Sequence, residues 1–279
     1  MFPAFAPHIA VRTVTLRSGM RLRVAESGPS DGRPVVMLHG WGASLYMFRH
    51  AFERFPRAGI RAIGVDLRGY GLSDKPLADD SYSLKAFSAD VDELLDELRL
   101  TRTALVGQSM GGGLALRYAL ARPERVSALA LINPTGLVNV PYVAVLRHSP
   151  AAIVDALGAR LVPRWMIRFI LRRLAYADPT IVTDRDIDEY WAPTQLPGFV
   201  RAARAALSEF DWSAATDEDA SRLAVPTLVV LGRRDRLVPN TNAAVSRLKG
   251  SRIEWVPGGH CAHEENPDLI YDMIADFVR

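Results

Sequence analysis

The chain has 279 residues, of which 49% are hydrophobic and 23% are charged, and its formal net charge is +3. This is ordinary globular composition, which excludes a disordered or collagen-like chain. The single cysteine, Cys261, excludes an internal disulfide framework. No apolar run approaches the roughly 20 residues that span a bilayer, and residues 1–8 lack the basic start of a signal peptide. We therefore expect a soluble cytoplasmic protein without stable membrane insertion.

Arginine supplies nearly all the positive charge, and the arginines are spread along the chain among acidic residues. Nucleic-acid binding needs a concentrated basic face, so we do not expect it. The densest stretch has Arg164, Arg168 and Arg172 at i, i+4 spacing beside Trp165 and Phe169. A basic amphipathic helix can contact a membrane. The ordinary interpretation of such a stretch is a solvated helix face.

The pattern from the N-terminus alternates between strands and helices. Residues 11–16 and 20–25 read as two strands joined by a turn. Short apolar runs without alternation, typical of strands covered on both faces, follow at 35–38, 62–65, 104–106, 128–132, 227–231 and 253–256. Helical patterns occupy 84–98, 110–121 and 267–278. We therefore predict an α/β fold with a mostly parallel sheet and helices on both faces.

The alternation stops after Asn133. From about residue 141 to residue 211 the pattern is helical, aromatic and rich in arginine, and it is interrupted by five prolines. A long helical stretch between two strands of one sheet indicates an inserted cap or lid. We accordingly assign residues 1–133 and 214–279 to an α/β core and residues 134–213 to a helical cap.

The sharpest motif is Gly107-Gln108-Ser109-Met110-Gly111, which reads G-x-S-x-G between a predicted buried strand and a predicted helix. This context places a serine on a tight strand-to-helix turn with its hydroxyl directed out of the sheet. The helix N-terminus that follows offers free N–H groups that can stabilise an oxyanion. Ser109 is therefore the candidate nucleophile.

A serine nucleophile needs a histidine base and a carboxylate that orients the histidine. After the serine the chain has His148, His260 and His263, and we prefer His260 because glycines precede it in a loop after a predicted strand. Asp235 directly follows another strand, as the acid of such a site should. The other common position for the acid holds Asn133, which carries no charge.

Two backbone N–H groups are expected to form the oxyanion hole. One belongs to Met110, the residue after the nucleophile, and the other comes from an earlier loop after a strand. That loop reads His39-Gly40-Trp41-Gly42, so Trp41 is the candidate for the second N–H, and its indole would form a wall of the pocket.

The chain resembles the α/β-hydrolase superfamily over nearly its whole length. The family's histidine motif is G-H-x-x-x-x-E-x-P, and only His260 fits that register, which settles the choice over His263. The resemblance implies an eight-stranded sheet with a helical cap after the sixth strand. It rests on His39 to Gly42, Asp66 to Asp74, the turn around Ser109, Gly232 to Pro239, and Gly259-His260 with Glu265-Asn266-Pro267.

The resemblance does not fix the reaction. Related haloalkane dehalogenases and epoxide hydrolases use aspartate where this chain has Ser109, and carbon–carbon bond hydrolases usually have tryptophan where it has Cys261. We therefore expect a serine hydrolase that cleaves carboxylic esters of small to medium, largely apolar substrates through an acyl-enzyme. A hydrolase of a lactone or carbon–carbon bond is an alternative, and so is a ligand receptor with slow turnover.

The cap should select the substrate, a small-molecule ester. The apolar and aromatic residues of the cap include Met166 and Phe199 as well as Trp165, Phe169 and Trp191. No metal or other cofactor is expected, because the chain lacks an HExxH motif and its single cysteine cannot build a thiolate site. The sequence does not fix the oligomeric state. The candidate substrate-binding residues are Trp41, Trp165, Phe169, Trp191 and His263.

Overall fold

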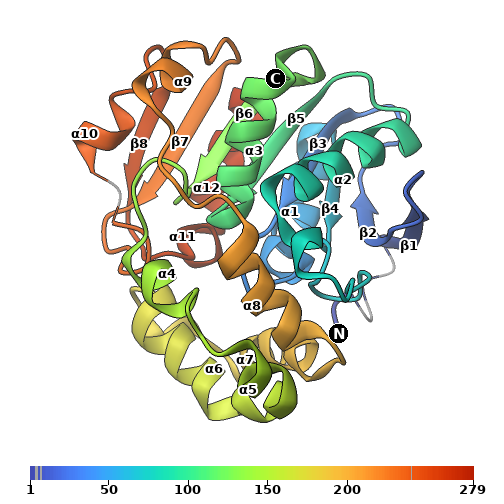
Figure 1. Ribbon diagram of the computed structural model, residues 1–279. Helices are drawn as coiled ribbons and strands as arrows, with labels where there is room; N and C mark the ends of the chain where they lie inside the picture. The colour runs from blue at the N-terminus through green and yellow to red at the C-terminus, as the bar shows by residue number, and fades with distance from the viewer. Residues whose placement is uncertain (4–5, 7, 240) are drawn as a thin grey trace.

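A computed structural model describes residues 1–3, 6, 8–239 and 241–279. All the predicted strands are present, in one eight-stranded sheet of order β1-β2-β4-β3-β5-β6-β7-β8 (Figure 1). The strands are β1 (Ala10–Thr15), β2 (Arg21–Ser27), β3 (Arg33–Leu38), β4 (Ile60–Val65), β5 (Thr103–Gln108), β6 (Val126–Ile132), β7 (Thr227–Gly232) and β8 (Arg252–Val256).

The sheet is mostly parallel. β2 runs antiparallel to both of its neighbours, β1 and β4, while every other pairing is parallel. The carboxyl ends of β3 and β5 to β8 therefore meet at one edge of the sheet, where loops from separate parts of the sequence come together. The prediction of a mostly parallel α/β sheet is confirmed.

Twelve α-helices lie within the described ranges. α2 and α3 cover one face of the sheet, and α1 and α12 cover the other. The helices are α1 (Ala51–Arg54), α2 (Leu84–Glu97), α3 (Met110–Ala121), α4 (Pro141–Leu146), α5 (Ala151–Leu157), α6 (Arg164–Ile170), α7 (Asp184–Trp191), α8 (Phe199–Glu209), α9 (Asp217–Ser221), α10 (Asn242–Val245), α11 (Ala262–Glu265) and α12 (Pro267–Phe277).

The double covering explains why the central strands are apolar without alternation. In β3, Val36 and Leu38 join the core cluster on the side of α2 and α3. Val35 and Met37 join the cluster on the side of α1 and α12. Successive side chains of a strand point to opposite faces, so a strand buried on both faces must be apolar at every position.

The residues between β6 and β7 include the helices α4 to α8, which we call the helical insertion (residues 134–213). Figure 1 shows these helices gathered at one end of the molecule, below the sheet. Its last helix, α8, is part of the same core cluster as α2 and α3, because Phe199, Ala202 and Ala206 are buried there. The insertion therefore packs, through α8, on the face of the sheet that α2 and α3 cover.

No helix in the described ranges is long and apolar enough to cross a membrane. The interpretation of residues 1–8 as lacking a signal peptide falls partly on residues 4, 5 and 7, which lie outside the described residues.

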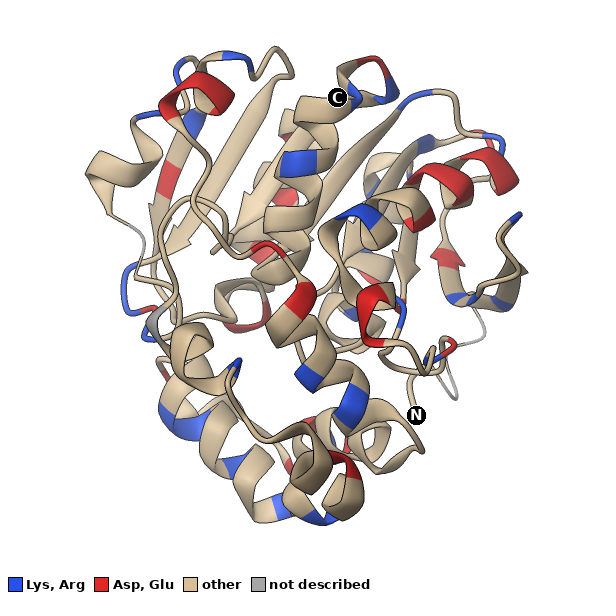
Figure 2. Ribbon diagram, viewed as in Figure 1, with Lys and Arg blue, Asp and Glu red and all other residues tan. Residues whose placement is uncertain are grey.

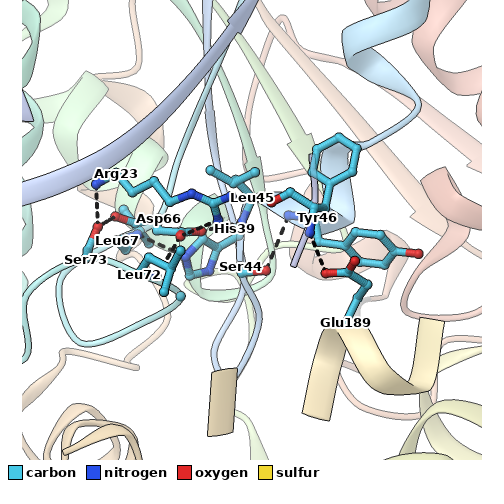
Figure 3. A network of polar contacts seen from close by, with 12 residues as sticks. Arg23, His39, Ser44, Leu45, Tyr46, Asp66, Leu67, Leu72, Ser73 and Glu189 are labelled. Carbon is cyan, nitrogen blue, oxygen red and sulfur yellow. Dashed lines mark hydrogen bonds and ion pairs between the residues drawn. The ribbon is translucent and has the colours of Figure 1, made fainter. Parts of the chain in front are cut away.

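A buried carboxylate connects the loops at the end of β4. Asp66 is fully buried, and its two oxygens accept the N–H groups of Leu45 and Leu72, each at 2.8 Å. The guanidinium of Arg23, on β2, lies 3.2 Å from the same carboxylate (Figure 3). Asp66 therefore holds together the segment after β3, the turn after β4 and an antiparallel strand.

We predict that Asp66→Ala lowers the free energy of unfolding by about 3–5 kcal/mol, because it leaves the buried Arg23 charge unpaired and two buried N–H groups without acceptors. Urea unfolding measures the loss. Asp74→Ala is the matched control, since Asp74 pairs with Arg21 of the same strand at the exposed surface and should cost much less. Equal losses in the two variants would contradict the role of Asp66.

Candidate active site

The candidate nucleophile lies in a strained turn between β5 and α3. Ser109 has φ +53° and ψ −119°, a conformation that residues with a side chain seldom adopt. Backbone hydrogen bonds hold it there: its N–H donates to Ile132 at 3.1 Å, and its carbonyl accepts from Gly113 and Thr135 at 3.0 Å each. A Cβ at Gly111 would lie 2.1 Å from the carbonyl oxygen of Leu38, so only glycine allows the helix to begin so close to β3.

The candidate base and acid form a hydrogen-bonded pair. His260, after β8, has its Nδ1 2.9 Å from Oδ2 of Asp235, after β7. The other carboxylate oxygen of Asp235 accepts the N–H groups of Leu237 at 2.8 Å and Val238 at 3.0 Å. Because a carboxylate only accepts, Nδ1 carries the proton and Nε2 is left as the basic nitrogen. The predicted order of serine, acid and histidine is thus brought together at one edge of the sheet.

Two buried amides connect this pair to the nucleophile turn. Asn133, after β6, accepts the N–H of Gly232 at 2.8 Å and donates to the carbonyls of Gly259 at 2.9 Å and His260 at 3.0 Å. Gln108, the residue before the nucleophile, donates to the same His260 carbonyl at 3.1 Å. The loops that carry acid and base are therefore held to the ends of β5 and β6.

Sequence reasoning treated Asn133 only as a position without a charge and missed its contacts. The available signal was an amide at the end of a buried strand, where a polar side chain needs partners.

The helical insertion contacts the histidine loop through Glu265. One carboxylate oxygen of Glu265 accepts the N–H of Gly259, and the other accepts those of Ala177 and Asp178, each at 3.0 Å. The N–H of Cys261 donates to the carbonyl of Ala175 at 3.0 Å. The acid of the G-H-x-x-x-x-E-x-P motif thus fixes the loop of His260 against the segment between α6 and α7.

The loop after β3 is held close to the nucleophile. His39 is fully buried; its Nε2 accepts the N–H of Leu67 at 3.0 Å (Figure 3), so its Nδ1 carries the proton and donates to the carbonyl of Gly40 at 2.8 Å. Burial lowers the pKa of His39, in keeping with this neutral form. A Cβ at Gly40 would lie 2.4 Å from the side-chain oxygen of Gln108 and 3.1 Å from Cβ of Ser109.

The two predicted oxyanion-hole residues each follow one partner of the close approach between Gly40 and Ser109. Met110 begins α3, so its N–H has no acceptor within the helix. Trp41 follows Gly40, and its indole N–H donates to the carbonyl of Ala203 on α8 at 2.8 Å. Trp41 thereby connects the loop after β3 to the helical insertion.

Ser109 and His260 line a cavity of about 600 Å³ between the sheet edge and the helical insertion. Most of its walls are aliphatic or aromatic, and the predicted Trp41, Met166 and Phe199 are among them. Its two cations are Arg204, which pairs with Asp79 and Asp155, and Arg236. Apolar lining residues that the sequence did not single out include Met47, Val154, Leu161, Ile167, Ile170, Leu171, Leu174 and Leu207.

The other candidate substrate-binding residues are not among those that line this cavity. Trp165 and Phe169 are 68% and 53% exposed on α6, and Trp191 donates its indole N–H to the carbonyl of Val162 at 3.0 Å. His263 is fully buried beside Phe48 and Tyr271. Contact of these four residues with a substrate therefore stays a prediction. For Trp165 and Phe169, helical periodicity alone did not show which side of α6 faces the cavity.

A buried charged network lies where the insertion meets the core. Arg49 pairs with Glu264 and, at 3.0 Å, with Asp186 of α7. The hydroxyls of Tyr46 and Tyr190 donate to Asp186 and Glu264, respectively. Burial opposes the charge of Glu264, but Arg49 and the neighbouring donors hold its pKa below the ordinary value. The network is charged at neutral pH and joins α7 to the region of His260.

A model of the alpha/beta hydrolase fold family matches residues 33–267, and the chain belongs to that family. One relative is a Bacillus subtilis (strain 168) protein provisionally named as a 2-succinyl-6-hydroxy-2,4-cyclohexadiene-1-carboxylate synthase. The two sequences are 31% identical over 280 residues, which cover 95% of this chain and 97% of the relative. This chain is also 31% identical over 286 residues to the non-heme chloroperoxidase of Streptomyces lividans, covering 92% and 98% of the two chains.

Among solved structures, the esterase EaEST from Exiguobacterium antarcticum superposes with a TM-score of 0.80. The identity is 24%, and the match covers 96% of this chain and 99% of the esterase. This likeness shows the fold. The three related proteins differ in their named activities, so family membership leaves the substrate open.

We predict that Asn133→Ala lowers kcat about ten- to a hundredfold on a substrate that the unmodified protein turns over, with little change in KM, because His260 loses the amide that fixes its backbone. Steady-state kinetics measure both constants. Asn242→Ala, which removes a side-chain contact to Trp255 outside the site, is the control and should keep kcat. A change in KM alone would show that Asn133 does not position the base.

We predict that buried His263 makes the protein less stable in mild acid. Burial lowers its pKa from 6.5 to about 4, so the unfolded chain takes up the proton first as the pH falls. The free energy of unfolding should therefore drop by about 2 kcal/mol between pH 7 and pH 5 from this residue alone. Urea unfolding at both pH values should show a smaller drop in His263→Leu; the same drop in both proteins would refute the assignment.

Proposed function

We propose that the chain is a serine esterase that cleaves carboxylic esters of small to medium, largely apolar substrates through an acyl-enzyme intermediate. The observation that carries the proposal is the combination of the Asp235–His260 pair at 2.9 Å with Ser109 in the same cavity. A histidine whose Nδ1 is held by a carboxylate, with Nε2 left to accept a proton, is the group that a serine hydroxyl needs for deprotonation.

In the proposed mechanism, Ser109 attacks the ester carbonyl while Nε2 of His260 accepts its proton. Asp235 stabilises the imidazolium that forms, and the N–H groups of Met110 and Trp41 stabilise the oxyanion of the tetrahedral intermediate. His260 then protonates the departing alkoxide. A water molecule that loses a proton to the same histidine then attacks the acyl-enzyme. As the second tetrahedral intermediate collapses, His260 gives that proton to the departing oxygen of Ser109, which releases the acid and restores the serine.

The composition of the cavity supports an apolar substrate. Few charged side chains line the cavity, and one of them, Arg204, is already paired with two carboxylates. A volume of about 600 Å³ falls within the range for small-molecule sites. Because apolar area removed from water is worth roughly 25 cal/mol per Å², an ester with an aliphatic or aromatic acyl group gains most from these walls.

We predict that the protein hydrolyses p-nitrophenyl esters in a series from acetate to laurate and that Ser109→Ala lowers kcat/KM on the order of 10⁴-fold or more. The chain-length optimum reports the usable depth of the cavity. Ser149→Ala is the matched control, because Ser149 lines the same cavity and its hydroxyl donates to the carbonyl of Leu146; it should stay within a few-fold of the wild type.

Retention of activity in Ser109→Ala would overturn the assignment of the nucleophile. Activity that depends on Ser109 but appears only with lactones or with carbon–carbon bond substrates would keep the nucleophile and replace the substrate class. No turnover of any of these compounds would favour a ligand receptor.

A further inference from the structure

The helical insertion exposes large apolar side chains to solvent. Those of Val145, Ile153, Leu157, Trp165 and Phe169, here called the outer apolar residues, are between 41% and 74% exposed. Within the described ranges, Trp165 is the only exposed tryptophan and Phe169 is the only exposed phenylalanine. Scattered apolar residues are normal on a protein surface, but here five large ones fall within 25 consecutive positions, residues 145–169.

Two of the helices that carry these residues, α5 and α6, are apolar on two sides. α5 exposes Ile153 and Leu157, while Val154 of the same helix lines the cavity. α6 exposes Trp165 and Phe169, and its Met166, Ile167 and Ile170 line the cavity. An ordinary surface helix has a polar outer face. Here a single layer of helix, apolar toward solvent as well as inward, separates the cavity of Ser109 from the outside.

The same segment is strongly basic. Residues 141–175 contain six arginines and one acidic residue, Asp155, which pairs with Arg204. Figure 2 shows arginines recurring along α6. Arg164 and Arg168 pair with acids of α7, whereas Arg160 and Arg173 have no ion pair within the described part of the chain. The charge of this segment complements an anionic surface.

We propose that the outer apolar residues bind at the surface of an anionic lipid bilayer without spanning it, with the surrounding arginines on the headgroups. Exposed tryptophan, phenylalanine and leucine beside arginine are the combination that binds the membrane interface without spanning it. A second copy of the chain is a poorer occupant, because a symmetric contact would bring two arginine-rich segments together. The cavity of Ser109 would then open one helix layer away from lipid esters.

The test is co-sedimentation of the full chain with vesicles of phosphatidylcholine alone or mixed with phosphatidylglycerol. The Ser109→Ala protein is used throughout, so that binding is measured without turnover and does not depend on the proposed esterase activity. We expect binding to the phosphatidylglycerol vesicles, much weaker binding to phosphatidylcholine alone, and loss of binding as salt is raised.

Two pairs of substitutions among the outer apolar residues locate the surface, and a third pair tests the charge. The double variant Trp165→Ser with Phe169→Ser should lower the partition coefficient on anionic vesicles about tenfold or more. The double variant Ile153→Ser with Leu157→Ser should lower the partition coefficient as well. Leu77→Ser is the matched control, because Leu77 is 77% exposed outside the insertion; it should bind as the parent does. Arg160→Gln with Arg173→Gln should weaken binding only to the anionic vesicles.

Thermal unfolding midpoints equal to the parent's show that the variants are folded. Absence of binding to either vesicle overturns the proposal, and so does binding that the Trp165 and Phe169 substitutions leave unchanged. Sedimentation velocity gives the remaining outcome: a dimer that these substitutions dissociate, without vesicle binding, would assign the outer apolar residues to contact between copies of the chain.

Discussion

The strained backbone of Ser109 is the constraint on which the candidate site depends. A positive φ at a serine is unfavourable by on the order of 1–3 kcal/mol and persists only where surrounding contacts enforce it. Here the carbonyl of Ser109 accepts from Gly113 and Thr135, and its N–H donates to the end of β6. The strain directs the hydroxyl out of the sheet, where the loops of the other parallel strands converge.

The remaining parts of the site are held relative to this turn by side-chain amides, carboxylates and an imidazole. Asn133 connects the ends of β6 and β7 to the histidine loop, and Glu265 connects that loop to the helical insertion. Asp66 and His39 fix the loop after β3 from behind. Each of these side chains satisfies two or more backbone groups, so loss of one affects loops that are distant in sequence.

Much of the fold could be predicted from the sequence because buried parallel strands must be apolar on both faces. The runs at 35–38 and 128–132 show this pattern, and β3 and β6 occur there. Three candidate residues could be located because each lies within a few residues of the end of a predicted strand, at the carboxyl edge of the sheet. They are Ser109, Asp235 and His260. Their hydrogen-bonded partners could not be located in the same way.

Asn133 and Glu265 act through contacts between segments more than 80 residues apart, which no local pattern encodes. The cavity-facing residues of the insertion were also missed in part. Apolar residues occur on both sides of α6, so periodicity could not tell Ile167 and Ile170, which line the cavity, from Trp165 and Phe169, which are exposed.

The central claim is that His260 activates Ser109 for covalent catalysis, and covalent labelling by a fluorophosphonate tests it most directly. Intact-protein mass spectrometry followed by peptide mapping should find one phosphonate per chain, on Ser109, with the rate of labelling strongly reduced in His260→Ala. Labelling of another residue, or an unchanged rate in His260→Ala, would contradict the account.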